Sequence, residues 1–123
     1  MQKKCETDLG IRLIRFAASV IKMLAYRESG KAFKHISDQL LRSATSIGAN
    51  YEEARAAEST ADFIHKMQIS LKEMRESYYW MAVSIDGGIV SGHESHSLFG
   101  EARQLRAILS KAVATAKANY KKG

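Results

Sequence analysis

The chain has 123 residues, of which 46% are hydrophobic, and it carries a formal net charge of +6. This length suits one domain with a sizeable core, and the apolar share excludes a largely disordered chain. No apolar run approaches the roughly 18 residues that a membrane span requires, the first residues lack the apolar segment of a signal peptide, and the single cysteine, Cys5, excludes an intrachain disulfide. We therefore expect one cytoplasmic domain over residues 1–123, with no membrane partner.

The first predicted helix covers residues 8–27, with Asp8 as its N-cap. Its apolar side chains spread over roughly 240° of the helical wheel, whereas one core-facing stripe needs only about 100°. A stripe of period 3.5 is expected to face the core of the chain, and it consists of Ile14, Ala17, Ile21 and Leu24. The surplus apolar surface favours contact with a second copy of the chain, and therefore a homo-oligomer, through Leu13, Phe16, Val20 and Met23.

The second predicted helix covers residues 31–58 and contains a run of small and polar residues around Gly48. A glycine inside a helix costs roughly 1 kcal/mol relative to alanine. Such a run is explained if another helix approaches closely there, and Asn50 must then be hydrogen-bonded or exposed. The expected core stripe is Phe33, Ile36, Leu40, Ala44, Ile47, Tyr51 and Ala54.

The third predicted helix covers residues 60–86, opened by a capping box at residues 59–62 and ended by the glycines after Asp86. Its expected core stripe is Ile64, Met67, Leu71, Met74, Tyr78, Met81 and Ile85. Beside this stripe lies a second band on one lateral face, made of Ile69, Glu73, Glu76 and Trp80. An indole with two carboxylates on one face is typical of a contact surface, so we add this band to the predicted oligomer interface.

The fourth predicted helix covers residues 94–120, and its apolar stripe is Leu98, Ala102, Leu105, Leu109, Ala112 and Ala116. Short connections make successive helices antiparallel. Together with the absence of a strand pattern, this predicts an all-α fold, an antiparallel up-down-up-down four-helix bundle.

No catalytic motif stands out in the sequence. Glu73 and Glu76 share one helical face, but a di-iron bundle requires Glu-x-x-His repeats on facing helices, and His65 lies eight residues upstream of Glu73. Salt bridges from these carboxylates to Arg42, or to arginines of a neighbouring first helix, are the favoured interpretation. The i, i+3 pair His93 and His96 has no further ligands nearby in sequence. We expect no metal, no cofactor and no enzymatic activity.

Positive charge is concentrated at the C-terminal end, where residues 94–123 hold six Lys/Arg against two acids. These cations can contact phosphates in a salt-dependent, sequence-tolerant manner, and they are Arg103, Arg106, Lys111, Lys117, Lys121 and Lys122. The first hypothesis is a non-enzymatic bundle protein that binds RNA or DNA, or a nucleic-acid-handling partner, through this helix. The alternative is a protein-binding scaffold module whose positive charge is incidental.

Two blocks of the sequence resemble the 23S rRNA intervening-sequence protein family, also called the S23 ribosomal protein family. The first block is residues 39–54; the second begins at residues 62–64 and continues through residues 70–73, Glu76, Tyr79 and Trp80. Many members have proline where this chain has Gly48, so a milder distortion of that helix is expected here. The family's name reflects reading frames inside insertions in ribosomal RNA genes and does not imply ribosome binding.

This resemblance implies an up-down bundle that assembles as a homo-oligomer, often a pentamer. The family is also similar to the accessory proteins of diversity-generating retroelements, basic barrels that bind a reverse transcriptase and nucleic acid. Structural or interface roles are implied for the positions that match the family's polar residues, namely Arg42, Asn50, Glu53, Glu73 and Glu76.

Overall fold

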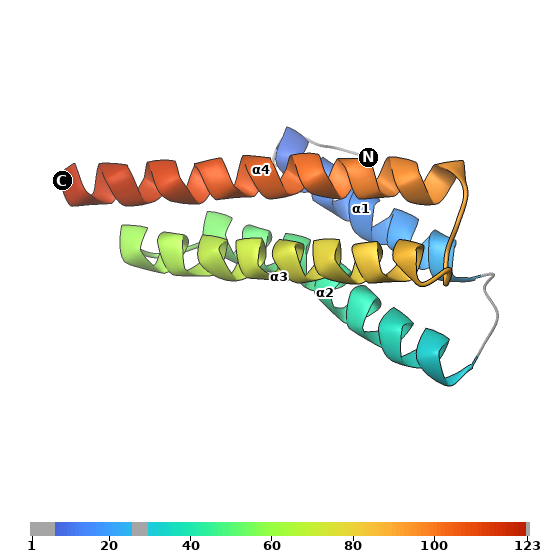
Figure 1. Cartoon of the computed structure of the whole chain (residues 1–123). Coiled ribbons are helices and arrows are strands. Elements are labelled where there is room, and N and C mark those ends of the chain that lie inside the picture. The colour runs from blue at the N-terminus through green and yellow to red at the C-terminus, as the bar shows by residue number, and fades with distance from the viewer. Residues whose placement is uncertain (1–6, 26–29, 123) are drawn as a thin grey trace.

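The computed structural model describes residues 7–25 and 30–122, which form four helices and no strand. The helices are α1 (Asp8–Ala25), α2 (Lys31–Arg55), α3 (Thr60–Asp86) and α4 (His93–Lys122) (Figure 1). Residues 26 and 27, where the first helix was expected to continue, lie outside the described residues, as does Cys5. The second helix ends three residues earlier than expected, and at its end the backbone N–H of Ala56 donates to the carbonyl oxygens of Glu52 and Glu53.

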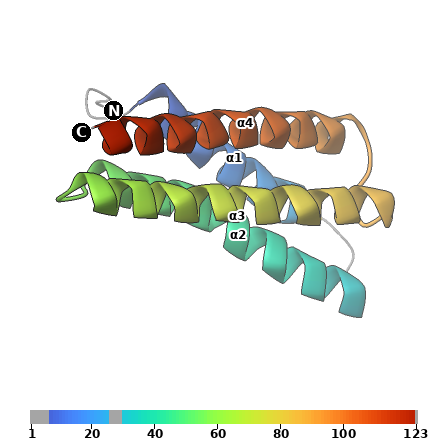
Figure 2. The same cartoon turned by 60° about the vertical axis from the view of Figure 1, so that its left-hand side comes forward.

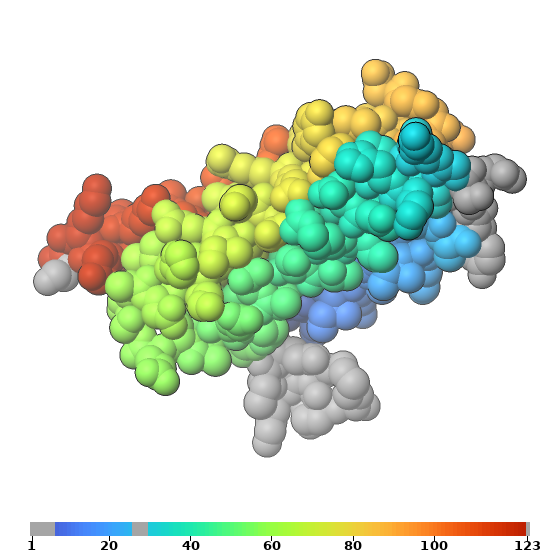
Figure 3. All heavy atoms as spheres, turned by 90° about the horizontal axis from the view of Figure 1, so that it is seen from below, coloured from blue at the N-terminus to red at the C-terminus, as the bar shows by residue number. Residues whose placement is uncertain are grey.

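The helices form an antiparallel up-down-up-down bundle, as predicted. In the described part of the chain each helix packs on its neighbours in sequence, α1 also contacts α4, and neither diagonal pair is in contact. The helices α3 and α4 run side by side along most of their lengths, whereas the first turns of α2 diverge from α3 (Figures 1 and 2). One face of the molecule is formed by α2 and α3, with α1 and α4 at its edges (Figure 3).

The face of α1 that packs into the core differs from the predicted one. Leu13, Phe16 and Val20 are at most 1% exposed and lie in the bundle's own core. Ile14 and Ile21, expected in the core, are 56% and 50% exposed. The prediction that Leu13, Phe16 and Val20 meet a second copy is therefore wrong. Both stripes have the same i, i+3, i+7 spacing and adjoin each other, so periodicity alone cannot decide which one is inside.

The contact between α2 and α3 is lined by small polar side chains. Ser70 and Ser77 are fully buried on α3 and alternate with methionines at heptad spacing. The Ser70 hydroxyl donates to the carbonyl oxygen of Ile47 at 2.8 Å, and the Ser77 hydroxyl donates to Ser43 Oγ at 2.8 Å. Short side chains that satisfy one another allow the two helices to approach closely. The predicted α3 stripe is corrected here, since the serines replace three expected residues that are only half-buried, namely Leu71, Tyr78 and Ile85.

Two of the four helix starts have a side-chain cap. At α3 the prediction is confirmed, because the Asp62 N–H donates to Ser59 Oγ at 3.1 Å. At α1 the predicted Asp8 cap is wrong: the Gly10 N–H donates to Thr7 Oγ1 at 2.8 Å. The Thr7 hydroxyl also lies 2.7 Å from the Tyr51 hydroxyl. Thr7 therefore both caps α1 and ties its first turn to the end of α2.

The helix that approaches the run of small residues around Gly48 of α2 is α1. A Cβ added at Gly48 would lie 3.5 Å from Leu13 Cβ, which is an ordinary contact. A Cβ added at Gly10 would lie 3.1 Å from both Glu52 Oε2 and Thr7 Oγ1, which is tighter. The α2 helix continues without a break through Gly48. A side chain would therefore be tolerated less well at Gly10 on α1 than at Gly48 on α2.

Candidate nucleic-acid interface

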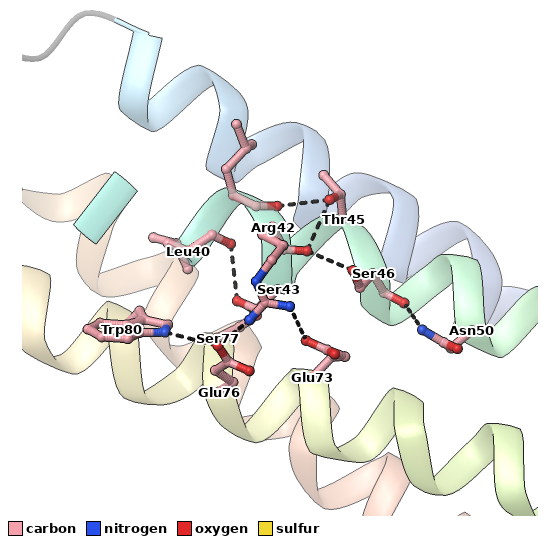
Figure 4. Close-up of polar contacts among 11 residues, drawn as sticks. Leu40, Arg42, Ser43, Thr45, Ser46, Asn50, Glu73, Glu76, Ser77 and Trp80 are labelled. Atoms are coloured by element: carbon pink, nitrogen blue, oxygen red, sulfur yellow. Dashed lines mark hydrogen bonds and ion pairs between the residues drawn. The ribbon is translucent and has the colours of Figure 1, made fainter. Parts of the chain in front are cut away.

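The carboxylates between α2 and α3 are paired within the chain. Arg42 on α2 donates to Glu73 Oε1 at 3.3 Å and to Glu76 Oε2, and the Trp80 indole N–H donates to the same Glu76 oxygen at 3.3 Å (Figure 4). The predicted salt bridge to Arg42 is thus confirmed. The hydrogen bond from Arg42 lowers the pKa of Glu76, and the same bond raises the pKa of Arg42. Glu76 is thus held as the ionised partner of an arginine, rather than poised for proton transfer.

The other polar positions implied by the family resemblance also interact within the chain. Glu53 accepts a hydrogen bond from Lys66 Nζ at 2.8 Å, linking the end of α2 to α3. Asn50 is half-buried and donates from Nδ2 to the carbonyl oxygen of Ser46 at 2.9 Å, one turn earlier in the same helix (Figure 4). Their contacts give both residues structural roles.

One of the two acids on α4 is neutralised by α1. Arg12 donates from Nε and Nη2 to the two carboxylate oxygens of Glu101, at 3.0 Å and 2.8 Å. This bidentate geometry is the strongest form of an arginine–carboxylate pair. It raises the pKa of Arg12 through the hydrogen bond to Glu101. Because Glu101 is paired with Arg12, it does not neutralise a cation of α4.

The six α4 cations that the sequence singles out form no ion pair with any described residue. At about 100° per residue, four of them fall within a sector of about 60°, namely Arg103, Arg106, Lys117 and Lys121. Lys111 and Lys122 lie about 80–100° away from this sector by the same geometry. Four of the predicted phosphate-binding residues therefore form a row along one face of α4, and the other two lie on a different face.

Two cations of α3 join this row, and the sequence analysis did not identify them. A groove between α3 and α4 is lined by Lys72 and Arg75 together with Lys117, and by Gln68, Ser110 and Ala114. No described residue forms an ion pair with Lys72 or Arg75. Antiparallel pairing of α3 with α4 could have pointed to them, because outward positions of α3 must then flank the row on α4.

Aromatic rings hold two of the α4 arginines in place. The Arg106 guanidinium lies 4.0 Å from the centre of the Tyr78 ring, and that of Arg103 lies 5.6 Å from the centre of Phe99. The two rings stack on each other, with centres 4.7 Å apart. A ring face orders a guanidinium without neutralising its charge, unlike a carboxylate. We call Lys72, Arg75, Arg103, Arg106 and Lys117 the α3–α4 basic surface.

The remaining predicted interface residues are mostly half-buried within the chain. Met23 contacts the start of α4, with its Sδ 3.7 Å from the Ser95 hydroxyl. Trp80 packs edge-to-face on His35, with ring centres 5.9 Å apart, and Ile69 is half-buried on α3.

The free apolar face lies along α1 and α2. Between α1 and α2, an apolar groove is lined by Ile14, Ala17, Ile21, Thr45, Gly48 and Ala49, among others. Leu41 of α2, 39% exposed, lies one turn before Thr45 on the same helix. The wide apolar arc of α1 predicts more apolar surface than one core can bury, and the structure shows that Ile14 and Ile21 are the large side chains of α1 that remain exposed.

No group of three or more His, Cys, Asp or Glu side chains that could hold a metal ion occurs among the described residues. His93 and His96 are exposed at the start of α4, and His96 Nδ1 is 3.0 Å from the carbonyl oxygen of Gly92. Within the same part of the chain, every helix is too short or too polar to span a membrane.

The comparisons with known proteins agree with this architecture. A crystal structure of a protein with unknown function from the S23 ribosomal protein family of Bacteroides thetaiotaomicron is similar to this chain, with a TM-score of 0.76 and 31% sequence identity. The alignment covers 85% of this chain and 97% of that one. No curated protein matches the sequence. Residues 11–111 match the family described as 23S rRNA-intervening sequence protein. The chain therefore belongs to the 23S rRNA-intervening sequence protein family.

Proposed function

We propose that this protein is a non-enzymatic, homo-oligomeric bundle that binds nucleic acid through the α3–α4 basic surface. One observation carries the proposal: the cations on this surface form no close ion pair with any described acid, although Lys72 helps lower the pKa of Glu76 through its charge. Glu53, Glu73, Glu76 and Glu101 are each in an ion pair with a cation elsewhere. Cations without an ion pair on one surface can bind a polyanion. When they neutralise the phosphates of a nucleic acid, the counterions condensed on that nucleic acid are released, which favours binding.

The geometry of the basic surface favours phosphates over isolated carboxylates. Its charges come from two adjacent helices. Lys72, Arg75 and Lys117 line the groove between them, and Arg106 and Arg103 lie further toward the start of α4, on the rings of Tyr78 and Phe99. Arg103 and Arg106 are ordered on aromatic rings, so less side-chain entropy is lost when they meet a ligand. A nucleic-acid backbone supplies several phosphates in a row, which matches a row of cations better than one small anion does.

The uncovered face of α1 and α2 supports self-assembly. Ile14 and Ile21 are half exposed beside an apolar groove, and residues of this kind gain about 25 cal/mol for each Å² removed from water. We propose that copies of the chain pack through this face and that the stoichiometry is the pentamer implied by the family resemblance. An oligomer repeats the basic surface, so weak phosphate contacts combine into tighter binding.

The binding proposal is tested with a fluorescent 20-nucleotide strand whose affinity is measured at 50 and 200 mM salt. The five cations of the α3–α4 basic surface, at a slope of about 0.7 for each contact with a single strand, predict a loss of roughly 10²-fold between these conditions. The variant Arg103→Ala/Arg106→Ala/Lys117→Ala should keep its helix content and lose binding. The control Lys22→Ala/Lys31→Ala/Lys34→Ala removes the same charge from exposed positions elsewhere and should bind like the wild type.

Two results contradict the binding proposal. If neither strand nor duplex binds at 50 mM salt, the protein is better described as a protein-binding scaffold with incidental positive charge. If the two triple variants lose affinity equally, overall charge rather than the α3–α4 basic surface is responsible.

The assembly proposal is tested by mass in solution. The wild type should have a mass close to five times the 13.7 kDa of one chain, and Ile14→Glu/Ile21→Glu should dissociate it, because charged groups cannot be buried unpaired at an apolar contact. Both positions are exposed in the single chain, so its fold should survive. A wild type that stays at 13.7 kDa at high concentration contradicts self-assembly.

A further inference from the structure

A second hollow continues the basic surface toward the end of α3 and is aromatic rather than cationic. It is lined by Tyr79, Val83 and Asp86 of α3 and by His96 and Phe99 of α4, among others. Phe99 belongs to both regions, because its ring stacks on Tyr78 and lies beneath Arg103. The cationic groove and the aromatic hollow are therefore consecutive parts of one surface between two antiparallel helices.

Tyr79 is the most available ring in this hollow. Its residue is 58% exposed, the highest value among the large apolar and aromatic residues that the structure describes as exposed. Its neighbour Trp80 meets it edge-to-face, with ring centres 5.0 Å apart and planes at 72°. That contact restrains the Tyr79 ring while much of its surface stays open.

An ordered ring next to a row of cations matches a single strand better than a duplex. Proteins that bind single strands combine a positively charged groove with aromatic side chains on which unpaired bases stack. In a duplex the bases are already stacked on one another, and a flat ring on a helix surface cannot reach their faces. From Gln68 to Asp86 the two regions extend along α3 for about 27 Å at 1.5 Å per residue, which leaves room for several nucleotides.

We propose, building on the function proposed above, that the ligand is single-stranded nucleic acid, with phosphates on the α3–α4 basic surface and at least one unpaired base stacked on Tyr79 in the aromatic hollow. The chemistry is shared by DNA and RNA, because both offer the same phosphates and flat bases. Asp86, at the end of the hollow, disfavours a phosphate there but can accept a hydrogen bond from a base.

The test measures the affinity of three probes at fixed salt: the single strand dT20, a 20-base-pair duplex, and inorganic polyphosphate, which has charge but no bases. Tyr79→Ala should weaken dT20 about tenfold and leave duplex and polyphosphate unchanged. Tyr79→Phe keeps the ring and should bind dT20 like the wild type. Unchanged polyphosphate binding shows that the variant is folded. The strand rU20 should respond as dT20 does.

The chain contains one tryptophan, Trp80, whose fluorescence gives an independent readout. A base stacked on Tyr79 lies next to the indole, so dT20 should change the Trp80 emission and polyphosphate should not. A matched control is Tyr120→Ala, because Tyr120 is also 54% exposed but lies near the far end of α4. This control should bind dT20 like the wild type.

The outcomes separate the two proposals. If Tyr79→Ala leaves dT20 affinity unchanged, weakens all three probes equally, or is matched by Tyr120→Ala, base stacking on Tyr79 is overturned while phosphate binding stands. If the wild type binds none of the three probes, the proposed function itself has failed.

Discussion

The two sides of α3 use charge in opposite ways. Toward α2, carboxylates and cations meet: Arg42 holds Glu73 and Glu76, and Lys66 holds Glu53. Toward α4, Arg106 meets an aromatic ring instead of an acid. One helix thus carries a side whose charges are neutralised by its own fold and a side whose charges remain available. Counting the net charge of the chain would not reveal this division.

The packing beneath these two sides differs as well. The α2–α3 contact is closed by buried serines, with Ser77 bonded to Ser43. The α3–α4 contact holds large rings and leaves a groove of about 490 Å³ beside Ser110. The closely packed side tolerates little change, whereas the grooved side has room for a ligand. Substitutions on the two sides should therefore change the free energy of unfolding to different extents. Three predictions on stability follow.

The largest effect is expected from enlarging a serine on the closely packed side. Ser77→Leu forces a bulky side chain into the α2–α3 contact and should lower the free energy of unfolding by about 1–3 kcal/mol. Ser110→Leu places the same side chain in the α3–α4 groove and should change it by less than about 0.5 kcal/mol. Chemical denaturation of both variants checks the pair. Equal destabilisation would show that the two contacts do not differ in packing.

A smaller effect is expected from breaking the ion pairs of the closely packed side. Arg42→Gln leaves Glu73 and Glu76 without their cation and should destabilise the protein by about 1 kcal/mol, since Arg42 is half exposed and its pairs are screened by solvent. A double-mutant cycle with Glu76→Gln isolates the pair, for which we expect a coupling of about 0.2–1 kcal/mol. A coupling of zero would mean that the Arg42–Glu76 pair does not stabilise the protein.

The smallest effect is a pH dependence from Glu76. Its pKa in the folded protein is lowered from the ordinary 4.5, chiefly by the hydrogen bond from Arg42. The unfolded chain therefore takes up a proton first, so the stabilisation is present above pH 4.5 and is lost as the pH falls through the lowered pKa. Denaturation midpoints measured across this range should drop more steeply for the wild type than for Glu76→Gln. Parallel curves would contradict the role of this pair.

Hydrophobic periodicity predicts most of the fold, because four amphipathic segments with turn residues between them allow few arrangements. It could not choose between the adjacent stripes of α1, since Leu13 and Ile14 differ by one position and are equally apolar. The same limit explains the serines of α3: Ser70 and Ser77 are polar in sequence and become core residues only because α2 supplies partners for their hydroxyls.

The candidate interface was predictable only in part. Arg103, Arg106 and Lys117 stand out because one helix carries them on one face. Lys72 and Arg75 are ordinary surface cations until α3 lies beside α4, and only the structure shows that they line the same groove. The pairing of Glu73 and Glu76 with Arg42 was foreseeable, because opposite charges on neighbouring helices neutralise each other.

The most direct test of the difference between the two sides is the salt dependence of dT20 binding in two charge-matched variants. Lys72→Gln/Arg75→Gln removes two unpaired cations, whereas Lys34→Gln/Lys66→Gln removes two that are paired with Asp38 and Glu53. The first variant should reduce the slope of log affinity against log salt by about 1.4, at about 0.7 for each contact with a single strand, and the second should leave it unchanged. Equal slopes in the two variants would contradict the claim that the cations facing α4 are the ones available to nucleic acid.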